Sequence, residues 1–154
     1  MTYERFEDLP VWKTVIDLAK KIYALTGKTP FSWKYSLRDQ LERATLSISN
    51  NIAEGFERGT TQELLTFLYI ARGSAGEVRS MLCFIERLKA FQDLKSEISN
   101  FKSQAGSISR QLRAWADSLQ NSDIKGQRYL NEKERSLAQN KKKREEFLAA
   151  LKNY

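Results

Sequence analysis

Apolar residues recur at alternating steps of four and three along much of the chain. After Thr60 the repeat runs through Leu64, Leu68, Ala71, Ala75, Val78, Leu82 and Ile85. A later repeat with the same rhythm runs through Leu94, Ile98, Phe101, Ala105, Ile108, Leu112, Trp115 and Leu119. Steps that average about 3.5 residues are typical of near-parallel helices whose side chains interlock. The pattern therefore predicts two long helices, each burying one face.

Two earlier segments have a similar apolar face. We expect a first helix to begin at Pro10, because a proline at the first helical position gives up no hydrogen bond, and to end near Gly27, a C-terminal cap. Its predicted apolar residues are Trp12, Val15, Ile16, Ala19, Ile22 and Tyr23. A second helix is predicted from about Ser36 to Ala53, with these residues inward: Leu37, Leu41, Ala44, Ile48 and Ile52. Short connections and no alternating strand pattern predict an all-α, antiparallel up-down-up-down four-helix bundle over residues 1–119.

Residues 47–77 contain four glycines in an otherwise helical pattern: Gly55, Gly59, Gly73 and Gly76. A glycine inside a helix costs about 1 kcal/mol relative to alanine, so each calls for a structural reason. We expect the first two to end the second helix, and Thr60 with Glu63 to form a capping box that begins the third. The last two fall in mid-helix, where with Ser74 they are expected to let another helix approach closely.

Asn51 and Glu54 are the polar positions of the segment SISNNIAEG. Asn51 lies between Ile48 and Ile52 on the apolar face of the predicted second helix, and a buried amide must be hydrogen-bonded. The two side chains either tie the end of this helix to neighbouring backbone or contact a ligand or nucleic acid. The sequence favours the structural alternative.

The predicted third helix has a second apolar stripe: Phe67, Ile70, Met81, Phe84 and Leu88. A helix in a four-helix bundle needs only one buried face, so this stripe indicates either burial on both sides or an interface between subunits. Cys83 lies beside the stripe, where a small packing residue is expected rather than a reactive thiol.

Composition limits the chemistry. The 154 residues include 26 basic and 19 acidic side chains, a net charge of +7, with one cysteine and no histidine. An internal disulfide and a Ser-His-Asp or Cys-His arrangement are excluded, and a usual zinc site or di-iron site has too few ligands. We therefore expect no enzyme, no metal and no cofactor. The charged N-terminus and the lack of a long apolar segment predict a soluble cytoplasmic protein with no membrane partner.

The basic excess favours polyanionic partners, although an ordinary basic protein would have the same charge. The candidate nucleic-acid contacts form rows on the third and fourth helices and a cluster near the C-terminus: Arg72, Arg79, Arg87, Lys95, Lys102, Arg110, Arg113, Lys141, Lys142, Lys143 and Arg144. The alternative is a solvated face in which these cations alternate with acidic residues. No base-reading motif is present, so we expect backbone contacts with little sequence preference.

Residues 120–154 differ from the rest. They begin with a polar segment, QNSDIKGQ, that is typical of a linker, and have a net charge of +4 from nine basic and five acidic side chains. The following residues predict a helix with a thin apolar stripe: Leu130, Leu137, Phe147, Leu148 and Leu151. We expect this basic C-terminal extension to become ordered only against a partner or its own bundle.

Three segments in order carry a family resemblance: FEDLPVWKTVIDLAKKIYALT, YSLRDQLERATLSISNNIAEGFER and the run through GSAGE that ends at Glu77. They resemble the four helix bundle proteins encoded by intervening sequences of bacterial 23S rRNA genes, a superfamily that includes the accessory variability determinant protein of diversity-generating retroelements. The resemblance covers roughly residues 3–119. Ser49 stands where relatives often have proline, which predicts a straighter second helix, and the extension lies outside the usual family length.

The resemblance implies a homopentamer of four-helix bundles with no known catalytic activity. Its retroelement members imply a nucleic-acid-binding partner of a reverse transcriptase. The leading hypothesis is therefore a non-enzymatic, oligomeric RNA- or RNA–DNA-binding accessory protein that partners a reverse transcriptase. The alternative is an oligomeric scaffold, encoded by an rRNA intervening sequence, that contacts only protein.

Overall fold

The structure is a computed structural model that describes residues 3–122 and 132–151. The long helices are α1 (Pro10–Thr26), α2 (Tyr35–Glu57), α3 (Thr61–Ile85), α4 (Lys95–Gln120) and α5 (Glu132–Leu151). Three short 3-10 helices are η1 (Phe6–Asp8), η2 (Phe31–Trp33) and η3 (Lys89–Leu94). The described ranges contain no strand, so the prediction of an all-α fold is confirmed.

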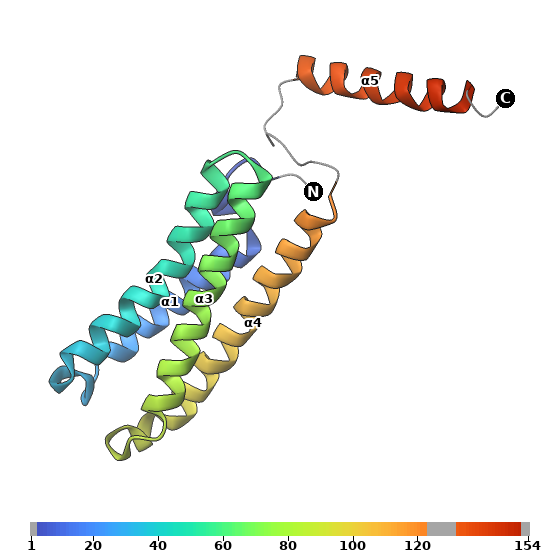
Figure 1. Cartoon of the computed structure of the whole chain (residues 1–154). Helices are drawn as coiled ribbons and strands as arrows, with labels where there is room; N and C mark the ends of the chain where they lie inside the picture. The colour runs from blue at the N-terminus through green and yellow to red at the C-terminus, as the bar shows by residue number, and fades with distance from the viewer. Residues whose placement is uncertain (1–2, 123–131, 152–154) are drawn as a thin grey trace.

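Helices α1 to α4 pack side by side, and a four-helix bundle fits their arrangement. Each helix contacts the next one along the chain, and α1 also contacts α4. Figure 1 shows that consecutive helices run in opposite directions. As a result, the start of α3 and the end of α4 lie at the same end of these four helices.

The core follows the apolar repeats. All seven predicted positions of α3 are at most 1 % exposed. In α4 the buried members of the predicted repeat are Ile98, Phe101, Ala105, Ile108 and Leu112. Leu94, Trp115 and Leu119 are partly buried against the core at the ends of this repeat. The predicted periodicity of both helices is confirmed, with Ala116 as a buried residue that the repeat did not include.

The apolar face of α1 is narrower than predicted. Tyr23 is 43 % exposed, so its assignment to the buried face was wrong. Trp12 and Ile16 are only partly buried. The main buried seam follows steps of four and three, through Val11, Val15, Leu18, Ile22 and Leu25, and Ala19 and Thr26 are buried beside it. Tyr23 lies about 100° around the helix from Ile22, which turns it away from the seam.

Gly55 lies inside α2 and does not end it, which corrects the prediction for this residue. The helix continues to Glu57, four residues beyond the predicted end. A Cβ atom on Gly55 would lie 2.6 Å from Cβ of Phe67 in α3, so the missing side chain allows the two helices to approach closely. Gly59 has φ of 83° and makes the chain reversal. A left-handed conformation of this kind is one that glycine adopts without strain.

Thr60 caps α3 as predicted. Its Oγ1 accepts a hydrogen bond of 3.2 Å from the Glu63 backbone N–H, which otherwise has no partner in the first turn. The Thr60 hydroxyl also donates to Glu63 Oε2 at 2.7 Å. The carboxylate therefore pairs with the capping hydroxyl.

Gly73 and Gly76 do not mediate close packing, contrary to the prediction. A Cβ atom on either residue would have no neighbour within 4 Å, and both residues are exposed. Small residues permit close approach only on a face that meets another helix, and these two face outward. Ser74, between them, is buried and does meet α2.

The C-terminal extension contains α5, as the apolar stripe predicted. Every described side chain from Asn140 to Leu151 is exposed. Most of the predicted linker, with Leu130 and the side chain of Leu137, lies outside what the structure describes. In the described ranges, none of the helices combines the length and apolar character needed to cross a membrane.

Candidate nucleic-acid interface

Arginine side chains from α3 and α4 converge where the two helices meet. They meet beside Gly106, a buried glycine of α4. A Cβ atom on Gly106 would lie 3.5 Å from Arg110 Nη1 and 3.7 Å from Arg79 Nε. Arg72 precedes Arg79 by seven residues and Arg113 follows Arg110 by three, spacings that keep each pair on one side of its helix. We call Arg72, Arg79, Arg110 and Arg113 the arginine strip.

Most of the arginine strip lacks acidic partners. Arg72, Arg79 and Arg110 have no carboxylate oxygen within 4.0 Å among the described residues. Arg113 Nε lies 3.7 Å from Asp117 Oδ2, and both side chains are more than half exposed. An exposed pair of this kind contributes little free energy. The strip is therefore a surface where like charges are gathered without internal neutralisation, which favours an external anion.

Lys102 and Arg87, also predicted as contacts, have an internal partner in Glu86. Lys102 Nζ donates to both carboxylate oxygens of Glu86, at 2.7 and 2.8 Å, and Arg87 Nη1 lies 3.3 Å from Oε1. The hydrogen bond from Lys102, with the nearby positive charges of Arg87 and Lys95, holds the pKa of Glu86 below its usual value. Arg87 also donates to the Cys83 carbonyl. These two cations are less available to a polyanion than the arginine strip.

Asn51 belongs to a polar bridge between α2 and α3. Its Nδ2 donates to the Ser47 carbonyl at 2.7 Å and to Ser47 Oγ at 3.0 Å. Ser47 Oγ lies 2.9 Å from Ser74 Oγ of α3. Glu54 accepts a hydrogen bond of 2.8 Å from Arg58. These bonds support the structural alternative for both motif residues.

The second apolar stripe of α3 is partly covered by the chain itself. Phe67 lies under the Arg58 guanidinium, 5.2 Å from the ring centroid, and Met81 and Leu88 pack partly buried against the core. Ile70 and Phe84 are 46 % and 55 % exposed. The structure thus leaves two of the five predicted interface residues largely free.

Two exposed aromatic residues that were not predicted as interface residues lie beside that stripe. Trp33 and Tyr35 are 79 % and 74 % exposed, and they line one hollow with Phe84 and Leu88. The sequence signal for these two residues is a tryptophan and a tyrosine on either side of Lys34, between the first two predicted helices. We call Ile70, Phe84, Trp33 and Tyr35 the apolar face.

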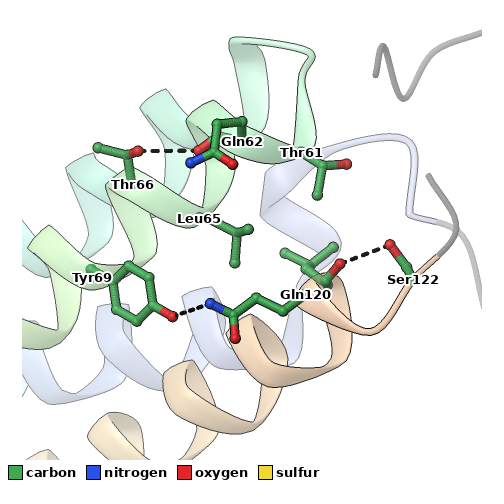
Figure 2. A pocket seen from close by; sticks show the side chains of 8 residues that line it. Thr61, Gln62, Leu65, Thr66, Tyr69, Gln120 and Ser122 are labelled. Carbon is green, nitrogen blue, oxygen red and sulfur yellow. Dashed lines mark hydrogen bonds between the residues drawn. The ribbon is translucent and has the colours of Figure 1, made fainter. Parts of the chain in front are cut away.

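A pocket of about 270 Å³ lies between the first turns of α3 and the last turn of α4. Its lining residues are Thr61, Gln62, Leu65, Thr66, Tyr69, Leu119, Gln120 and Ser122. Figure 2 shows that Tyr69 and Gln120 point toward one another, and Gln120 Nε2 donates to the Tyr69 hydroxyl at 2.7 Å. No pattern along the chain predicted this pocket, because its two walls are some fifty residues apart in sequence.

A comparison with family models identifies the chain. The model described as 23S rRNA-intervening sequence protein matches residues 7–114. The chain belongs to this family. The match spans α1 to α3, most of α4 and the whole arginine strip, and it confirms the resemblance found in the sequence. No curated protein matches the chain.

The C-terminal extension lies beyond the part that matches the 23S rRNA-intervening sequence protein family. Four cations are exposed on α5, a helix that contributes no residue to the arginine strip: Lys141, Lys142, Lys143 and Arg144. Three apolar side chains of α5 are also exposed: Phe147, Leu148 and Leu151. In the part of the chain that the structure describes, no three cysteine or acidic side chains gather to hold a metal ion.

Proposed function

We propose that this member of the 23S rRNA-intervening sequence protein family is a non-enzymatic accessory protein that binds RNA, or an RNA–DNA hybrid, through the arginine strip. The observation that carries the proposal is the convergence of Arg79 and Arg110 over Gly106 with no acidic partner in the described chain. Phosphate oxygens accept several guanidinium hydrogen bonds at once, so a nucleic-acid backbone is the anion that this arrangement fits best.

The spacing of the strip suits a phosphate backbone. Arg72 and Arg79 are separated by seven residues, or about 10 Å along the helix axis. The strip is therefore long enough for one nucleic-acid strand to meet it with more than one phosphate. Such contacts give affinity and orientation without reading bases. A symmetric oligomer would repeat the strip and strengthen its field.

The test is the salt dependence of RNA binding. We expect the triple variant Arg72→Glu, Arg79→Glu, Arg110→Glu to bind a labelled RNA much more weakly than wild type in fluorescence anisotropy. The slope of log K against log salt should fall by about 2 to 3, because three phosphate contacts are lost. Wild-type affinity and slope in this variant would refute the proposed surface.

A matched control separates the strip from net charge. Lys13, Lys20 and Lys21 of α1 are exposed and have no ion pair in the described structure. Replacing all three with glutamate changes the net charge by the same amount as the triple arginine variant. We expect this control to keep nearly the wild-type slope. An equal loss in both variants would mean that only the overall charge matters.

The second candidate function is an oligomeric scaffold that contacts only protein, and the apolar face favours it. Phe84 shares a hollow with the exposed aromatic residues Trp33 and Tyr35, and Ile70 is exposed on the same helix as Phe84; exposed apolar side chains of this kind are what protein interfaces cover. We expect wild type to form a homo-oligomer, a pentamer as the resemblance implies. The double variant Ile70→Ser, Phe84→Ser should have a mass closer to that of the monomer when it is measured by light scattering. An oligomer that binds no RNA at low salt would favour the scaffold. Specific capture of a reverse transcriptase would support the accessory role.

A further inference from the structure

We infer that the pocket between α3 and α4 receives one unpaired nucleobase of the bound RNA, so that the protein prefers single-stranded RNA to duplex. This inference rests on the proposed function and specifies its ligand. It assigns binding to neutral residues that lie outside the arginine strip, chiefly Tyr69 and Gln120.

The lining suits a nucleobase in size and chemistry. A volume of about 270 Å³ has room for one planar ring system. Tyr69, which is 45 % exposed, offers an aromatic face on which a base can stack. Gln120 and Gln62 offer side-chain amides that can pair with the edge of a base, and Leu65 supplies apolar contact. The lining contains no charged side chain, which matches a neutral base rather than a phosphate.

The pocket continues the arginine strip at one end of the bundle. Tyr69 precedes Arg72 by three residues, so the two lie on neighbouring positions of α3. Gln120 follows Arg113 by seven residues and shares its side of α4. A strand whose phosphates follow the strip would therefore arrive at the pocket with its next nucleotide. In a duplex that base is stacked and paired, whereas in a single strand it is free to turn into the pocket.

The Tyr69–Gln120 hydrogen bond is the contact that a base would replace. Both atoms belong to side chains at the surface, and both can form a new bond to a base edge. The exchange leaves no buried polar atom without a partner, so it carries little penalty. Tyr69→Leu removes the aromatic face and the hydroxyl together, while Tyr69→Phe removes only the hydroxyl.

The experiment compares a 12-nucleotide single-stranded RNA with a 12-base-pair RNA duplex by fluorescence anisotropy. We expect wild type to bind the single strand more tightly. Tyr69→Leu should weaken single-strand binding about 5- to 100-fold, the range for losing one stacked base, and leave duplex binding unchanged. The salt slope should stay at the wild-type value, because no phosphate contact is lost.

The control is Tyr23→Leu, which removes an equally exposed tyrosine from α1, a helix that contributes no residue to this pocket or to the arginine strip. It should bind both RNAs like wild type. If Tyr69→Leu also keeps wild-type affinity for the single strand while the arginine variant loses its salt slope, the base pocket is wrong and the proposed function stands. If wild type binds neither RNA at 50 mM salt, both are overturned. A single abasic nucleotide that abolishes the preference at one position would support the pocket directly.

Discussion

Replacing Gly55 with alanine should destabilise the protein, although the same change usually stabilises a helix. The new Cβ would lie 2.6 Å from Cβ of Phe67 and 3.2 Å from Cδ1 of Leu64. Carbon atoms in contact prefer about 3.5 to 4.0 Å, so α2 and α3 would have to separate by roughly 1 Å. Cβ of Phe67 is fixed to its backbone and cannot move aside by a change of rotamer.

The magnitude follows from two opposing terms. Alanine gains about 1 kcal/mol over glycine from helix propensity. Overpacking typically costs about 1 to 3 kcal/mol, and a backbone-anchored clash of this depth belongs at the upper end. The net expectation is a loss of about 2 kcal/mol in the free energy of unfolding. For a chain of this length that corresponds to a fall in Tm of about 4 to 8 °C.

The assay is urea unfolding followed by circular dichroism at one protein concentration, because an oligomer would make stability depend on concentration. Gly73→Ala and Gly76→Ala are matched controls, since a Cβ on either residue meets nothing within 4 Å. Each should gain about 1 kcal/mol. If Gly55→Ala were as stable as these two variants, the close approach of α2 and α3 at Gly55 would be wrong.

Two further predictions concern single side chains. Thr61 Oγ1 is buried and has no hydrogen-bond partner in the described structure. Thr61→Val should therefore raise the free energy of unfolding by about 1 kcal/mol in the same urea assay. A lower free energy of unfolding in this variant would mean that the hydroxyl has a partner. The lowered pKa of Glu86 stabilises the fold above the ordinary glutamate pKa, and this stabilisation is lost as pH falls through the lowered value. Lys102→Met removes the main cause, so its stability deficit at pH 7 should shrink as unfolding is measured down to pH 3. A deficit that does not change with pH would contradict this assignment.

Several features of the fold could be predicted from the sequence because they depend on neighbours along the chain. The start of α1 at Pro10 and the cap at Thr60 are local hydrogen-bonding problems with local solutions. The buried face of α3 follows from its repeat, since helical geometry places residues three and four apart on one side. The family assignment also comes from the sequence, because it rests on residue types in order.

Other features depend on which face of a helix meets which neighbour, and a repeat does not specify that. Apolar repeats, caps and residue types along the chain specify the helices, most of their buried faces, the basic excess and the family. The packing of the helices, in contrast, places Gly55 and not Gly73 at a close approach, and it pairs Lys102 with Glu86 while Arg79 and Arg110 remain without an acidic partner in the described chain. The physical reason is distance along the chain: these groups are brought together by the rotation and packing of whole helices, which follow from the complete core rather than from any local pattern.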